Sequence, residues 1–165
     1  MRIVVISDTH MPKKSKKLPG RLLADLKTAD LIVHAGDWET PELFSQLQFY
    51  APVKGVTGNV DDPELKDILS EKIMFDFKGF TFGVVHGHGK RQTTEKRAIS
   101  AFSDESVDCI IFGHSHIPKL YHRNGVLMFN PGSPTDKRRE KYFSHGIITI
   151  DQVLHAQHVF YSDKN

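Results

Sequence analysis

The sequence predicts an α/β protein in which more than one β-sheet is covered by helices. Two observations support this fold class. The first third of the chain alternates short apolar strands with amphipathic helices, and the second half consists mainly of strands. A third observation, clusters of Asp, Asn and His directly after several strands, indicates where a site would lie. The 165 residues fall in the usual size range of one domain, so we expect a single domain over residues 1–165.

The first third contains three short apolar runs, which predict buried strands at residues 2–6, 31–33 and 52–56. Leucines at helical spacing follow Pro19-Gly20 and predict the first helix. Thr40-Pro41-Glu42 has the N-cap residue, the proline and the acidic first turn that begin a second helix. This βαβαβ order predicts a parallel sheet covered by helices.

The second half has a different pattern. Lys78-Gly79 separates two alternating runs that predict a hairpin. One further helix is expected at residues 94–102. The remaining apolar runs predict strands at residues 109–112, 119–122, 126–129, 145–150 and 155–161. Because these strands are too many for one small parallel sheet, we expect a compact α/β sandwich.

Composition narrows the function classes. Hydrophobic residues make up 39% and charged residues 25% of the chain, which argues against disorder, collagen-like repeats and a membrane protein. Asp8 and His10 interrupt the first apolar run well short of a signal-peptide core, so we expect a cytoplasmic protein. The single cysteine, Cys109, lies in an apolar run and is interpreted as a buried thiol. With a net charge of +2, a nucleic acid is not expected as a stable partner, and neither is a membrane.

Polar clusters follow five of the predicted strands, at residues 7–10, 34–37, 57–61, 86–89 and 113–116. Ligands of open α/β sheets bind beyond the carboxyl ends of the strands, so these clusters can form one site. Glycines at 36, 58, 87 and 113 are expected to let the backbone turn sharply after each strand.

Carboxylates and imidazoles without cysteine are ligands for divalent Mn, Fe, Zn, Co or Ni. The clusters hold more such groups than one ion needs, which favours a two-metal site that can clamp a phosphoryl group. In the Asp8-Thr9-His10 and His114-Ser115-His116 motifs, alternate residues of an extended strand end would point into one pocket. Each residue alone is better explained as a turn or cap residue, but the ordered set favours metal binding.

These motifs give the chain a family resemblance. The motifs that carry it, in order, are Asp8-Thr9-His10, Gly36-Asp37, Gly58-Asn59, His86, Gly113-His114-Ser115-His116 and Asn130-Pro131-Gly132-Ser133. The chain resembles the calcineurin-like metallophosphoesterase superfamily, and within it the small YfcE-like phosphodiesterases. The resemblance implies an αββα four-layer sandwich of two mixed β-sheets flanked by helices, with two metal ions at the strand ends.

The resemblance also implies a ligand set. One ion would be held by Asp8, His10, Asp37 and His116, and the other by Asn59, His86, His114 and the shared Asp37. A hydroxide bridging the two ions would attack phosphorus, so Asp37, Asn59 and His86 would act in catalysis through the metals. The family implies Mn as the preferred ion, with Ni, Fe, Zn or Co as alternatives. Small members often form dimers or tetramers, so the resemblance allows a homo-dimer or tetramer, but the sequence does not determine the oligomeric state.

One position departs from the wider superfamily. Val60 stands where many members have a histidine that contacts the phosphate and protonates the leaving group. The YfcE-like branch also tends to lack that histidine, which agrees with the assignment but leaves the general acid open. His88 is a candidate for that role, and its alternative is a supporting or surface imidazole.

The leading hypothesis is a metal-dependent phosphodiesterase acting on small phosphodiesters. Its alternatives are a scaffold or protein-binding module on the same fold, as in the retromer subunit, and a phosphomonoesterase. The complete ligand set favours an enzyme, while Val60 favours weak or narrow activity.

Several other features stay open. The lysines within residues 13–17 are either a solvated charge run or a device that steers anionic substrates. A second basic run at residues 137–141 has no predicted place relative to the site. His34 is expected to be a core residue, Trp38 to pack or line the pocket, and Asp61 to shape the loop after Asn59.

Overall fold

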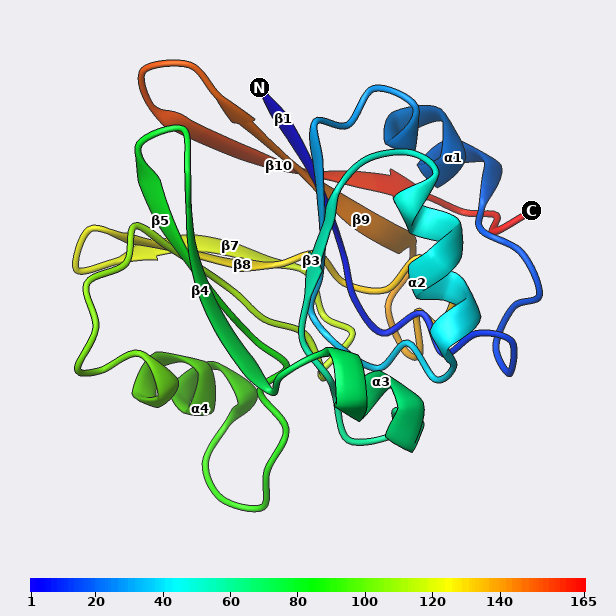
Figure 1. The fold of residues 1–165 in the computed structure, drawn as a ribbon, viewed down its shortest axis with the longest axis horizontal. Coiled ribbons are helices and arrows are strands. Elements are labelled where there is room, and N and C mark those ends of the chain that lie inside the picture. Colours follow the sequence, from blue (N-terminus) through cyan, green and yellow to red (C-terminus); the bar gives the residue numbers. More distant parts are fainter.

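The computed structural model describes residues 1–165 and contains two mixed five-stranded sheets with four helices (Figure 1). In chain order the elements are β1 (Arg2–Ile6), α1 (Gly20–Leu26), β2 (Leu31–His34), α2 (Pro41–Gln48), β3 (Val53–Gly55), α3 (Pro63–Ile68), β4 (Lys72–Phe77), β5 (Phe80–Val85), α4 (Thr94–Ala101), β6 (Cys109–Ile111), β7 (Lys119–Arg123), β8 (Val126–Asn130), β9 (Phe143–Ile150) and β10 (Leu154–Tyr161).

The first sheet has the strand order β10-β9-β1-β2-β3. Strands β1, β2 and β3 are parallel and are connected through α1 and α2, which confirms the predicted βαβαβ unit. Strand β9 pairs antiparallel with β1, and β10 pairs antiparallel with β9 along all eight of its residues. The last two strands therefore return to the sheet that the first strand began.

The second sheet has the order β4-β5-β6-β8-β7. Its two edges are the hairpins β4–β5 and β7–β8, and β5, β6 and β8 in its centre are parallel. The carboxyl ends of the parallel strands of both sheets carry the polar clusters identified in the sequence.

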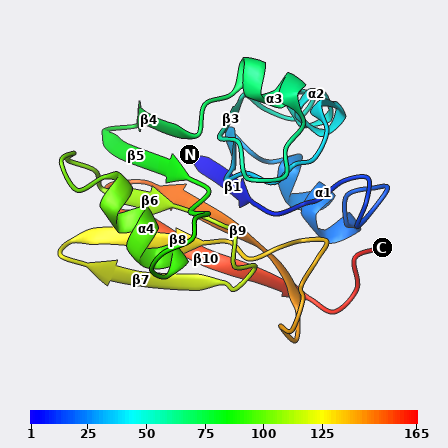
Figure 2. The same cartoon turned by 90° about the horizontal axis from the view of Figure 1, so that it is seen from below.

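Three apolar layers hold these elements together, and the period of two along each strand creates them. Ile3 and Val5 of β1 face the second sheet, whereas Val4 and Ile6 face the helices on the outside. The middle layer lies between the two sheets and contains the buried thiol of Cys109. Figure 2 shows α4 on the side of the second sheet and the other three helices on the side of the first. The molecule thus has four layers of secondary structure.

Local details differ from the sequence expectations at two helices. Helix α3 was not expected, because it has six residues and buries only Leu65. Thr40 does occupy the N-cap of α2, but its hydroxyl donates to the carbonyl of Met11 instead of capping the helix. None of the helices has the length and apolar character needed to cross a bilayer.

Candidate metal centre

Six of the predicted ligands meet where the two sheets present their carboxyl ends. Asp8 and His10 follow β1, Asp37 follows β2, His86 follows β5, and His114 and His116 follow β6. They form two triads whose ligand atoms lie within 4.8 Å of one another: Asp8, His10 and His116 in the first, and Asp37, His86 and His114 in the second.

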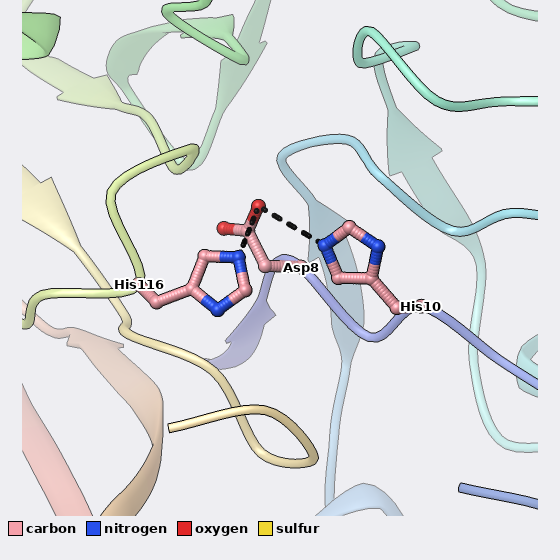
Figure 3. A group of neighbouring side chains, drawn as sticks. All are labelled: Asp8, His10 and His116. Atoms are coloured by element: carbon pink, nitrogen blue, oxygen red, sulfur yellow. Dashed lines mark ion pairs between the residues drawn. The ribbon is translucent and has the colours of Figure 1, made fainter. Parts of the chain in front are cut away.

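In the first triad the two imidazoles face one carboxylate oxygen (Figure 3). Oδ1 of Asp8 lies 3.4 Å from Nε2 of His116 and 4.0 Å from Nε2 of His10. These three atoms are buried, and none of them has a hydrogen-bond partner. Such an arrangement leaves three lone pairs directed at one point.

The second triad adjoins the first through Asp37. Its Oδ2 lies 3.0 Å from Nε2 of His86 and 3.6 Å from Nε2 of His10, so this carboxylate reaches both triads. The ring of His114 meets the ring of His86 edge-on, with 5.2 Å between their centroids. Asp37 therefore connects the two triads.

Hydrogen bonds on the outer side of the ligands orient them. Nδ1 of His86 donates to the carbonyl of Ala35 at 2.7 Å, and Nδ1 of His116 donates to the carbonyl of Asp136 at 2.5 Å. Each bond holds the Nδ1 side of the ring at a backbone carbonyl and directs Nε2 into the centre, as is usual for metal-binding histidines. Oδ2 of Asp8 accepts from the hydroxyl of Ser7 and the amide of His114, which leaves Oδ1 for the centre.

The ligand residues of the alternating motifs do not lie on extended strand ends, so that prediction is wrong. We expected residues at strand ends to remain extended, but five of the ligands have left-handed backbone conformations with φ between 44° and 69°: Asp8, His10, Asp37, His114 and His116. Such conformations cost about 1–2 kcal/mol for residues other than glycine, and they gather at functional sites. In addition, the His114-Ser115-His116 motif is divided, with one imidazole in each triad.

Two of the four predicted turn glycines have a different role from the expected one. Gly58 and Gly113 do not have positive φ angles, so they are not needed for the turn. A Cβ at Gly58 would lie 2.0 Å from Oδ1 of Asp37, and a Cβ at Gly113 would lie 1.9 Å from the hydroxyl of Ser7. These glycines make room for the carboxylates and the groups that hold them.

Asp61 organises the loops of the centre without facing it. Its buried carboxylate accepts hydrogen bonds from the amides of Asp37 (3.1 Å), Glu39 (2.8 Å) and Gly58 (2.7 Å). It therefore joins the loop after β2 to the loop after β3. The sequence suggested only that Asp61 shapes its own loop, because the partners on the other loop are more than twenty residues away.

The two neighbouring aromatic rings are core residues, as expected for His34. Its Nε2 contacts the hydroxyl of Thr9 at 2.9 Å, and its ring stacks on Trp38 with 3.7 Å between centroids. Trp38 is fully buried and donates from Nε1 to the carbonyl of Val56, so it packs and does not line the centre.

The remaining predicted site residues lie around the triads. Asn59 is exposed in the loop after β3, between two residues whose amides donate to Asp61 and Asp37. Val60 is exposed in the same loop. His88 is half-buried, with ring centroids 5.5 Å from His86 and 6.4 Å from His114, and its Nδ1 has no partner.

The Asn130-Pro131-Gly132-Ser133 motif supports the centre from behind. The side-chain amide of Asn130 donates to the carbonyl of Gly113 at 3.0 Å, and the hydroxyl of Ser133 donates to the carbonyl of Asp8 at 2.8 Å. Thr135, which the sequence analysis did not identify, donates to the carbonyl of Thr9 at 2.6 Å. The segment after β8 is thus fastened to both ligand loops of the first triad.

The charges in the centre favour a cation. Burial raises the pKa of Asp8 to about 7, and the nearby Asp37 carboxylate adds to this rise. Against the effect of burial, the Asp8 and Asp37 carboxylates raise the pKa of His86 to about 9, and contact with His86 lowers the pKa of Asp37 to about 2. The two buried carboxylates therefore favour the binding of positive charge at the centre, and metal ions can supply that charge.

The other imidazoles are held neutral, which is the form that binds metals. Burial lowers the pKa of His114 and of His116 to about 4, and it lowers that of His10 as well. The nitrogen and oxygen donors, their orientation and their unpaired buried atoms all fit divalent cations.

Comparisons with known proteins agree with this geometry. The sequence model of the calcineurin-like phosphoesterase superfamily domain matches residues 1–153. A probable metallophosphoesterase of Methanothermobacter thermautotrophicus is 32% identical over 140 residues, which are 84% of this chain and 80% of the relative. A phosphodiesterase of Methanocaldococcus jannaschii is 27% identical over 146 residues, which are 80% of this chain and 83% of the relative.

Among solved structures, Vps29 of Entamoeba histolytica complexed with zinc has a TM-score of 0.75 to this chain at 24% identity. The match covers 97% of this chain and 99% of Vps29. It confirms the predicted fold class, two mixed sheets flanked by helices on both outer faces.

Proposed function

The chain belongs to the calcineurin-like phosphoesterase superfamily, and from this premise we propose that it is a dinuclear metal-dependent phosphodiesterase that hydrolyses small phosphodiesters. The name of the Methanocaldococcus jannaschii relative supports the preference for diesters. The presence of both triads supports two ions in place of one.

One observation carries this proposal. Oδ1 of Asp8 and the Nε2 atoms of His10, His86 and His116 are buried, converge on one region and lack hydrogen-bond partners. Each unpaired buried polar atom costs about 1–3 kcal/mol, so a fold that gathers four of them needs a ligand to satisfy them. Divalent cations match their chemistry and the surplus negative charge.

We assign the first ion to Asp8, His10, Asp37 and His116, and the second to Asn59, His86, His114 and Asp37. When bound at these residues, divalent ions would neutralise phosphoryl charge and would activate water as a nucleophile near neutral pH. The ring nitrogens are kept in place by the Ala35 and Asp136 carbonyls. Such outer hydrogen bonds contribute 10- to 100-fold to metal affinity.

Because Val60 cannot transfer a proton, we assign the protonation of the departing alcohol to His88. Its ring lies beside both His86 and His114, and its Nδ1 has no hydrogen-bond partner within the protein. General acids of this kind contribute 10²- to 10⁴-fold to the rate.

Mixed oxygen and nitrogen ligation supports Mn²⁺ as the ion. The single buried thiol supports a reducing, cytoplasmic setting.

The test is hydrolysis of bis(p-nitrophenyl) phosphate by metal-stripped protein with and without added Mn²⁺. We expect Mn²⁺-dependent turnover in the wild type and its loss in His86→Ala. His122→Ala, which removes an exposed imidazole on β7, is the matched control and is expected to retain turnover. Turnover that survives in His86→Ala, or that does not require a metal, would contradict the proposal.

Two other functions are outcomes of the same test. Faster hydrolysis of p-nitrophenyl phosphate than of the diester would identify a phosphomonoesterase. No turnover by protein shown to bind two Mn²⁺ would favour the scaffold function, which the likeness to Vps29 and the presence of Val60 make the next candidate.

A further inference from the structure

A turn with three consecutive cations lies beside the metal centre. Lys137, Arg138 and Arg139 follow the segment that is fastened to the centre by Thr135 and by the Asp136 carbonyl on His116. The sequence left the position of this turn open. The structure places it next to the first triad, so its charges act on whatever the centre binds.

Arg138 is the member of the turn that lies closest to the ligands. Its Nη1 donates to the carbonyl of His114 at 3.4 Å, and its backbone has a left-handed φ of 50°. Its side chain is exposed, as is that of Arg139. Neither guanidinium has a carboxylate within 4.0 Å, although Asp136 and Glu140 are close in sequence. Two exposed guanidiniums without a carboxylate partner thus lie in the turn beside the centre.

Two adjoining hollows share Ser115, Ile117 and Arg138 in their walls. The first has a volume of about 450 Å³ and includes the ligand His114. The second has a volume of about 400 Å³, and its other walls are Lys137, Arg139 and Glu140. Arg138 therefore stands between a hollow whose wall includes the ligand His114 and one that is lined mainly by charged side chains.

The net charge of the second hollow is suited to a phosphate. Three cations and the carboxylate of Glu140 leave two positive charges, which match the charge of a phosphomonoester near neutral pH. Arginines bind phosphate oxygens in pairs of parallel hydrogen bonds, and exposed guanidiniums can reorient to do so.

We propose that this second hollow binds a phosphate group of the substrate remote from the diester that is cleaved, with Arg138 and Arg139 as its charge partners. The inference rests on the proposed function and narrows its substrate class to phosphodiesters that carry a further phosphate, such as nucleotide-derived diesters with a terminal phosphomonoester. The diester occupies the metals beside His114, and the remote phosphate lies past Arg138.

The experiment compares two probes by isothermal titration calorimetry on Mn²⁺-loaded protein: AMP, with one phosphate, and adenosine 3′,5′-bisphosphate, with two. We expect the wild type to bind the bisphosphate about tenfold or more tightly than AMP, and Arg138→Gln to lose most of this preference. Arg123→Gln, which removes an exposed guanidinium from the end of β7, is the matched control and is expected to keep the preference.

Equal preference in the wild type and Arg138→Gln, or no preference in the wild type, would overturn the proposal. An equal loss in Arg123→Gln would also overturn it, because general surface charge would then explain the binding. Hydrolysis of bis(p-nitrophenyl) phosphate, which has no second phosphate, is measured in parallel. If the protein hydrolyses this diester but does not prefer the bisphosphate, only the phosphate site in the second hollow is refuted. If the protein prefers the bisphosphate through Arg138 but hydrolyses no diester, the phosphate site is supported and only the phosphodiesterase activity is refuted.

Discussion

At the scale of single residues, the ligands depend on groups that do not face the centre. Asp61 accepts three amide hydrogen bonds from two loops, and the Ala35 and Asp136 carbonyls fix the imidazoles of His86 and His116. These contacts hold five strained ligand residues in conformations that the unfolded chain seldom adopts. The precision of the centre therefore comes from its surroundings as much as from its ligands.

Asp61→Asn tests this dependence with little change in volume. The amide NH₂ of asparagine would face at least one backbone N–H, which leaves a buried donor unpaired. We expect the free energy of unfolding to fall by about 2 kcal/mol and the affinity for Mn²⁺ to fall 10- to 100-fold. Urea unfolding and Mn²⁺ titration measure the two effects.

Asp62→Asn is the control, because Asp62 is exposed at the N-terminus of α3 and its side chain caps nothing. Full Mn²⁺ affinity in Asp61→Asn would show that the loops hold their positions without this carboxylate.

At the scale of secondary-structure elements, a buried cluster between α1 and the first sheet joins that helix to three strands. Asp25 of α1 contacts Arg2 of β1 and lies 2.9 Å from Nε2 of His145 on β9. Nδ1 of His145 lies 3.2 Å from the hydroxyl of Tyr161 at the end of β10. Arg21 also approaches Asp25, at 3.4 Å, so two guanidiniums compete with His145 for its charge.

This cluster predicts a pH dependence of stability. Burial lowers the pKa of His145 from its ordinary value of 6.5 to about 4. Since His145 is neutral in both states above pH 6.5, its contribution is complete there. Below pH 6.5 His145 binds a proton in the unfolded chain but remains neutral in the folded protein, so the free energy of unfolding decreases as the pH falls toward 4. The loss from this group is about 2 kcal/mol at pH 5.

His145→Gln removes the titrating group and retains a hydrogen-bonding side chain. We expect the wild type to be the more stable protein at pH 7.5 and its advantage to shrink by about 2 kcal/mol at pH 5. Urea unfolding at the two pH values measures this difference. The contributions of the other histidines cancel, because they are the same in both proteins. A wild-type advantage that grows at pH 5 would mean that His145 is protonated and paired with Asp25.

At the scale of the whole molecule, basic segments from distant parts of the chain gather on one side of the centre. Lys14 lies 3.7 Å from Asp136, and Lys164 donates to the carbonyls of Lys14 and Thr135. Residues 13–17 are therefore adjacent to the segment that leads into the 137–139 turn. Lys16 also lines a hollow of about 280 Å³ beside Met11, next to the first ligand loop.

This arrangement favours the steering hypothesis for the lysine run over a merely solvated charge run. Replacing Lys13, Lys14, Lys16 and Lys17 with Gln is expected to lower kcat/KM for a phosphodiester several-fold at 20 mM salt and to have little effect at 500 mM, because salt screens the field. Steady-state kinetics over a salt series measures the effect.

The control replaces four exposed cations that lie outside both basic runs with Gln: Lys27, Lys54, Lys78 and Arg123. A deficit that is the same at all salt concentrations, or equal in the control, would show that the lysine run does not steer substrate.

The α/β class, the βαβαβ unit and the candidate ligands could be read from the sequence, because each depends on neighbouring residues. Apolar runs mark the strands, and Asp8, Asp37, His86 and His116 follow directly where those strands end. The short helix α3 was not predicted, because it buries only one leucine and has no periodic apolar pattern.

Tertiary structure alone decided the rest. Strands β9 and β10 could have joined either sheet, and only pairing with β1, some 140 residues away, assigns them. The left-handed ligand conformations, the three amides on Asp61 and the place of Arg138 beside His114 likewise depend on partners from other loops. Local patterns cannot encode such contacts, because a hydrogen bond between distant residues leaves no periodicity in either segment. The chemical groups that are available can therefore be read along the chain, whereas the contacts among them depend on the fold.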